Sequence, residues 1–104
     1  MRLTKLGEIF AERMLVVDGD AVVIRIGKPV RIPEEGNLGA YFECPLQISG
    51  PGDQEWFRSI AGQNSMQALI LAIRFVGTEL QRQQEHSQIA WEGNEDLGFP
   101  LLNV

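Results

Sequence analysis

Reactive side chains are scarce in this sequence, which has one cysteine, Cys44, and one histidine, His86, among its 104 residues. A single cysteine excludes an internal disulfide and any metal site built from several cysteines, and it is typical of a protein in a reducing compartment. The sequence also lacks an H-E-x-x-H pattern, a calcium loop and a cluster of His and Cys ligands. We therefore expect no metal site, no cofactor and a cytoplasmic location.

A Cys–His nucleophilic pair is formally available from Cys44 and His86. However, Cys44 shares an apolar strand face with Phe42, Leu46 and Ile48, where a free thiol behaves as a small hydrophobic group. Carboxylates are numerous but form no recognisable acid–base pair, and we expect most of them to be solvated surface charges: Glu8, Glu12, Glu43, Asp53, Glu55, Glu79 and Glu92. The sequence thus predicts no catalytic residues.

Runs of basic residues and long apolar runs are missing too. The formal charge is −5, and the basic residues are scattered along the chain, so the average surface repels nucleic-acid phosphates and anionic lipid. The longest apolar run, Ala68 to Ile73, is far too short to span a membrane, and Glu8 and Glu12 interrupt the start of the chain, where a secretion signal would need apolar residues. We expect neither nucleic-acid nor membrane binding.

The first half of the chain shows strand patterns. Residues 9–17 and 21–26 flank Asp18-Gly19-Asp20, which is a hairpin signal, and residues 40–49 alternate between apolar and polar side chains. Pro45 within that alternation indicates an edge position or a bulge, because proline lacks the N–H of a ladder hydrogen bond. Residues 55–61 form a fourth predicted strand, and Pro33 to Gly39 are predicted to be an exposed acidic loop.

The second half predicts a helix from about Ser65 to Gln84, capped by Asn64 with Gln67 three residues later. Its N-terminal half is apolar almost all round, so one sheet face cannot cover every side chain there. Either the C-terminal segment or a second copy of the protein must cover the rest, and we favour the C-terminal segment because it is tethered. This segment supplies Trp91, Leu97, Phe99, Leu101 and Leu102.

These elements predict an α+β domain spanning residues 1–104. A four-stranded antiparallel meander is followed by one long helix on one sheet face, and the C-terminal segment folds back over the helix or the sheet edge. A short fifth strand near Gln88 to Glu92 is compatible with the pattern.

Several patches resemble a family of small bacterial proteins known only as a domain of unknown function. The resembling residues are Ala11-Glu12-Arg13, Arg25 to Pro29, Cys44-Pro45, Ile48-Ser49-Gly50, Ser65 to Leu69, Trp91 and Leu97 to Pro100. The chain departs from the family's usual form at Asn64, where an aspartate is common, and asparagine also caps helices. The resemblance implies a bacterial protein with four strands followed by a helix, and it implies no activity.

For function we favour a non-enzymatic interaction module that binds a protein partner, because an acidic domain with one solvated sheet face suits a basic partner. An antitoxin-like or immunity-type role fits such a module. The candidate partner-binding residues are Glu34, Glu35, Arg13, Arg25 and Trp91. A surface ion pair across the hairpin is the simpler explanation of Glu12, Arg13 and Arg25, and it would contribute under about 1 kcal/mol.

The alternative function is a small-molecule binder or enzyme with a pocket between helix and sheet. Trp56, Tyr41 or Trp91 would line this pocket, and Arg13 or Arg25 would hold an anion. This hypothesis requires Arg25 to lie in a concave apolar pocket, and it loses support if Arg25 lies on a flat solvated sheet face. A homodimer joined through an edge strand or the helix is compatible with either function.

Overall fold

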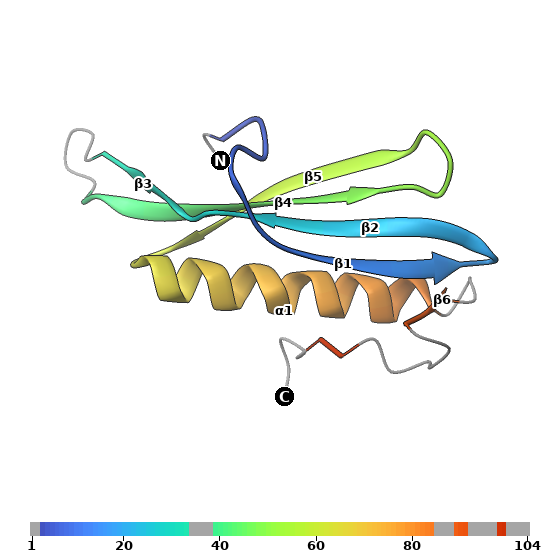
Figure 1. Ribbon diagram of the computed structural model, residues 1–104. Coiled ribbons are helices and arrows are strands. Elements are labelled where there is room, and N and C mark those ends of the chain that lie inside the picture. Colours follow the sequence, from blue (N-terminus) through green and yellow to red (C-terminus); the bar gives the residue numbers. More distant parts are fainter. Residues whose placement is uncertain (1–2, 34–38, 85–88, 92–97, 100–104) are drawn as a thin grey trace.

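The computed structural model describes residues 3–33, 39–84, 89–91 and 98–99, which form an antiparallel sheet with one helix packed on one face (Figure 1). The strands are β1 (Ile9–Val17), β2 (Asp20–Gly27), β3 (Val30–Ile32), β4 (Tyr41–Ser49), β5 (Glu55–Gly62) and β6 (Ile89–Ala90), and the helix is α1 (Ser65–Gln83). The prediction of an α+β fold, with an antiparallel meander followed by a helix, is confirmed. Glu34 and Glu35 lie outside the described residues.

The hairpin between β1 and β2 turns through two residues with positive φ, Asp18 at 49° and Gly19 at 88°. Two such residues make a type I′ turn, whose twist matches that of the strands. The turn places Val17 opposite Asp20 and, further along, Glu12 opposite Arg25. The short turn therefore sets which side chains share a sheet face.

The strand β3 was not predicted from the sequence. It pairs with the same strand, β4, as β2 does, and Ile26 lies opposite Leu46 while Val30 lies opposite Glu43. The β2–β3 side thus contains one residue more than the β4 side, which is a bulge. Pro45 lies opposite this break in the ladder, so the predicted bulge at this proline is present although β4 is a central strand.

The helix packs a face of small and aliphatic side chains against the sheet. Ala68, Ala72, Val76 and Leu80 are buried at four-residue intervals, and the two alanines allow the helix to approach closely. Gly62 at the end of β5 belongs to the same contact, because a Cβ there would lie 2.8 Å from the Ala68 Cα. The sheet face under α1 is called the inner face below.

The start of the helix matches the predicted cap in part. The Gln67 backbone N–H donates to Asn64 Oδ1 at 2.8 Å, as expected for an N-cap. The Gln67 side chain accepts from the Gln63 N–H at 2.6 Å, so it satisfies the residue before the cap and not the cap itself.

The described part of the C-terminal segment packs on the inner face. Trp91 and Phe99 contact the buried core, and β6 pairs with Val16 and Val17 of β1, close to the predicted fifth strand. Met66 and Ile70 of α1 are nevertheless exposed. Leu97, Leu101 and Leu102 lie outside the described residues. Within the part of the chain that the structure describes, no helix has both the length and the apolar character needed to cross a membrane.

Candidate functional site

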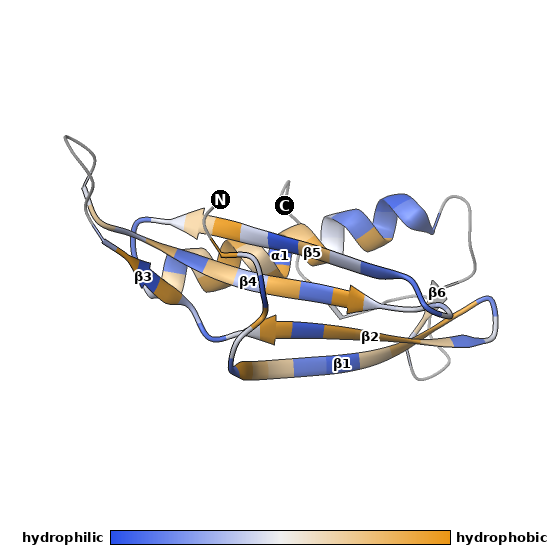
Figure 2. Ribbon diagram, turned by 90° about the horizontal axis from the view of Figure 1, so that it is seen from above, coloured by the Kyte–Doolittle hydropathy of each residue, from blue (hydrophilic) through white to orange (hydrophobic). Residues whose placement is uncertain are grey.

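The sheet face opposite α1, called the outer face, carries a group of apolar side chains near the β1–β2 turn. Met14 lies opposite Val23 and Val16 lies opposite Ala21, and these four residues are called the outer patch. Met14 is 62% exposed, and Val16 and Ala21 are also exposed. Phe10, at the bulge of β1, adds another exposed apolar side chain on the same strand. Figure 2, which views the molecule from above, shows β1 at the side of the sheet away from β5.

Polar residues border the outer patch. Arg25 Nε donates to Glu12 Oε2 at 3.2 Å, and Gln47 Nε2 donates to Glu55 Oε1 at 3.2 Å. Asp18 and Asp20 follow the patch at the turn. Within the described part of the chain, carboxylates around the patch thus outnumber guanidinium groups, which gives the border a negative charge. Apolar side chains with an arginine and a polar border are typical of the composition of protein–protein interfaces.

The other end of the outer face is covered by the chain itself. Residues 3–8 cross it, and Leu3 donates its backbone N–H to Glu43 Oε1 at 3.0 Å (Figure 1). The same carboxylate accepts from the Tyr41 hydroxyl at 2.9 Å and from the Ser59 hydroxyl at 2.8 Å. Glu43 is only 1% exposed, so it is an exception to the expectation that most carboxylates are solvated.

A glycine allows this crossing. A Cβ on Gly27 would overlap the Leu6 carbonyl oxygen and lie 2.7 Å from Pro45 Cγ. The Lys28 backbone N–H also donates to the Glu8 carbonyl at 2.8 Å. The N-terminal segment therefore lies directly on the sheet at the bulge, where the ladder between β2 and β4 is interrupted.

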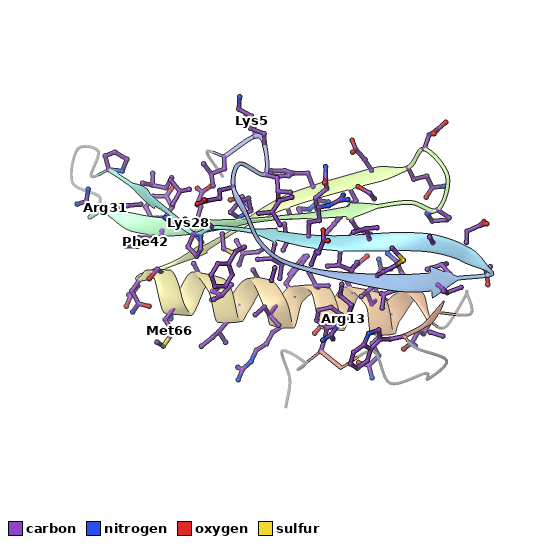
Figure 3. All side chains as sticks on the ribbon, in the orientation of Figure 1. Lys5, Arg13, Lys28, Arg31, Phe42 and Met66 are labelled. Carbon is purple, nitrogen blue, oxygen red and sulfur yellow. The ribbon has the colours of Figure 1, made fainter. Side chains whose placement is uncertain are left out.

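The predicted partner-binding residues Arg13, Trp91 and Arg25 lie on two different faces. The Arg13 guanidinium carbon is 4.0 Å from the Trp91 ring centroid and 4.9 Å from that of Phe99, on the inner side of the sheet (Figure 3). Arg25 lies on the outer face, with Glu12. Arg13 and Trp91 thus hold the C-terminal segment against β1, whereas Arg25 belongs to the border of the outer patch.

A cavity of about 170 Å³ opens on the inner side, between the sheet, the helix and the C-terminal segment. Its described lining is Ala11, Glu12, Arg13, Ile24, Ile26, Ile73, Gly98 and Phe99. Arg25 does not line it, and the side chain of Arg25 pairs with Glu12 on the outer face instead. This placement weakens the hypothesis of an anion pocket built around Arg25.

The other aromatic residues considered for such a pocket lie apart from this cavity. Trp56 lines a separate open groove with Ile48 and Glu79. The Trp56 ring stacks on Phe75 with 5.9 Å between the ring centroids, and the Arg58 guanidinium lies 4.7 Å from the Trp56 centroid.

Glu79 in this groove has a pKa below its ordinary value, and the main cause is the hydrogen bond that it accepts from Arg82.

Cys44 lies on the inner side of β4, fully buried, where its Sγ donates to the Gly27 carbonyl at 3.5 Å. Burial raises the pKa of this thiol from 9.0 to about 11. The thiolate is the nucleophilic form of cysteine, so Cys44 is unreactive at neutral pH. His86 lies outside the described residues. Among the described residues, His, Cys, Asp and Glu side chains form no group of three that could hold a metal ion.

Sequence reasoning did not find the outer patch. The exposed Met14 and Val16 gave a signal, because they occupy alternate positions in a strand whose other face is already apolar.

These features define a two-layer α+β protein whose outer sheet face is partly covered by its own N-terminal segment and partly open. A family model described as a domain of unknown function (DUF6968) matches residues 11–101, and the chain belongs to this family. No curated protein and no solved structure matches the chain.

Proposed function

We propose that this protein is a non-catalytic module of the bacterial cytoplasm that binds a protein partner through the outer patch. The observation that carries the proposal is the apolar group formed by the exposed Met14, Val16 and Ala21 with the half-buried Val23, on a face that the chain covers elsewhere. Exposed apolar groups with a polar border are commonly interaction sites.

The charges around the patch indicate the chemistry of the partner. Glu12, Asp18, Asp20 and Glu55 surround the patch, and among the described residues Arg25 is the one basic residue in this border. A complementary partner surface has an apolar centre and basic residues around it, and such charges speed association and select against acidic proteins. An antitoxin-like or immunity-type role, in which a small acidic protein covers a basic surface, suits this complementarity.

Two methionines allow a matched test. Met14 in the outer patch and Met66 on the helix are exposed to similar extents, 62% and 69%. The variants Met14→Lys and Met66→Lys therefore introduce the same charge at similarly accessible positions on opposite faces. The two variants and the native protein are used to capture partners from a bacterial lysate, and each captured protein is identified, purified and measured by titration calorimetry.

The proposal predicts a stoichiometric partner that Met66→Lys retains and Met14→Lys loses. The affinity of that partner for the native protein falls as salt rises, because salt screens the charges of the border. A partner that binds Met14→Lys as tightly as the native protein would disprove binding through the outer patch. A parallel variant with Glu34→Lys and Glu35→Lys tests whether the acidic loop contributes.

A further inference from the structure

The inner cavity lies on the opposite side of the sheet from the outer patch, and its described walls come from the sheet, the helix and the C-terminal segment. Ala11 of β1 with Ile24 and Ile26 of β2 form the sheet side, Ile73 of α1 forms the helix side, and Phe99 closes it from the C-terminal segment. Its described lining is mostly apolar, its volume is about 170 Å³, and it is partly open to solvent.

We propose that this cavity is a binding site for a small uncharged apolar molecule, about the size of benzene or toluene. An engineered apolar cavity of about 150 Å³ binds benzene, so 170 Å³ is sufficient for a single aromatic ring. The same volume is too small for a helix or a strand of another protein. The open side provides the entry path that a fully enclosed core cavity lacks.

The mostly apolar lining of the cavity favours an uncharged ligand. The Glu12 carboxylate pairs with Arg25 on the outer face, away from the cavity, and the Arg13 guanidinium packs on the rings of Trp91 and Phe99. A charged ligand would lose its hydration against Ile24, Ile26 and Ile73, and burying a charge without a dedicated partner is strongly unfavourable.

The wall formed by Phe99 depends on Gly98. This glycine has a φ of 75°, and a Cβ there would lie 2.8 Å from Arg13 Nη1 and 2.8 Å from the Trp91 ring. Only glycine fits this position without strain. A side chain at residue 98 is therefore expected to displace Phe99 and to open the cavity.

The test is a titration of the full chain with toluene, followed by NMR of the isoleucine and methionine methyl groups. We expect saturable shifts at Ile24, Ile26 and Ile73 and none at Met14. The variant Ala11→Leu fills the cavity from an exposed position and should weaken toluene binding by about tenfold or more. Ala61→Leu makes the same change at an exposed alanine of β5 outside the cavity, and it should leave the affinity within about twofold.

Three outcomes would overturn the proposal. One is a native chain that shows no saturable shift up to the solubility of toluene. Another is shifts that centre on Met14. The third is benzoate or benzylammonium binding as tightly as toluene. If Ala11→Leu does not fold, toluene binding is measured on Gly98→Ala instead. Native-like toluene affinity in that variant would contradict the assigned site, because a side chain at residue 98 should displace Phe99. Toluene titration tests the cavity and capture of a protein partner tests the outer patch, so the two proposals succeed or fail separately.

Discussion

The two ends of the outer sheet face differ in which side chains are buried and which are exposed. At one end the chain lays residues 3–8 over Glu43, a carboxylate, and removes it almost completely from water. At the other end Met14 and Val16, which are apolar, remain exposed. Solvation alone would favour the reverse, since carboxylates prefer water and methionine and valine do not.

This contrast separates a buried structural contact from the surface that we propose to bind a partner. The covered end balances the cost of burying a charge by giving Glu43 hydrogen bonds from Leu3, Tyr41 and Ser59. Nothing comparable offsets the exposure of the outer patch within the described residues. An exposed apolar group adds nothing to folding stability, so its retention on an otherwise ordinary surface is more readily explained by binding than by folding.

The largest effect is expected at Glu43. The Glu43→Gln variant removes the charge and leaves one carbonyl oxygen for three donors, so it should lower the free energy of unfolding by about 2 to 4 kcal/mol. Urea unfolding measures the loss. The control is Glu12→Gln, because Glu12 forms an exposed pair with Arg25 and should lose under about 1 kcal/mol. Equal losses in the two variants would show that the covered end is not held by Glu43.

The next effect concerns the neighbouring residue of β4, on the inner face. Burial raises the Cys44 pKa to about 11, whereas the unfolded thiol titrates near 9. The folded state then resists losing this proton, so the contribution to stability is complete below pH 9 and is lost as the pH rises towards 11. The loss amounts to about 2 to 3 kcal/mol, at 1.36 kcal/mol for each pKa unit.

This pH effect is measured by urea unfolding between pH 8 and 11, the range around the two thiol pKa values, on the native chain and on Cys44→Ala. The alanine variant is less stable at neutral pH because it loses buried volume, but it lacks the thiol and should fall less steeply with pH. Parallel pH profiles for the two proteins would mean that Cys44 is accessible to water.

Local pattern accounts for much of the fold. The β-forming side chains of residues 9–17 and the alternation in residues 40–49 predicted these strands. The turn at Asp18 and Gly19 fixes Glu12 opposite Arg25, so this pair is implied by counting back from the turn. The strand β3 escaped prediction because its three residues lie between Pro29 and Pro33, too short a segment to show a period.

The candidate site was less predictable, because alternation assigns a residue to a face without saying what covers that face. Glu43 and Gln47 occupy the same face of β4, yet only Glu43 lies under the N-terminal segment. That covering depends on Gly27, which is distant in sequence from Leu3 and shows no local pattern. For the same reason Arg13 and Arg25 looked equivalent, although one packs against the C-terminal segment and the other borders the outer patch.

A smaller effect is expected from lifting the N-terminal segment without touching Glu43. Gly27→Ala places a Cβ where the Leu6 carbonyl and Pro45 now lie, so the segment must move away from the sheet. We expect a loss of about 1 to 2 kcal/mol and faster hydrogen exchange of the Leu3 amide. Gly39→Ala is the control, because nothing lies within 4 Å of a Cβ there. Unchanged exchange at Leu3 in Gly27→Ala would show that the segment does not rest on this glycine.

The smallest effect on folding is expected at the end of the outer face that carries the outer patch. A small loss of stability there would distinguish this end from the end that contains Glu43. Met14→Thr removes an exposed apolar side chain and suits a strand, so the free energy of unfolding should change by less than about 0.5 kcal/mol. Urea unfolding at neutral pH checks this beside Glu43→Gln. A loss above about 1 kcal/mol would mean that Met14 packs within the protein, and the outer patch would then be a structural surface covered by the chain itself. A negligible loss, together with the loss of partner binding in Met14→Lys, would assign Met14 to recognition and Glu43 to folding.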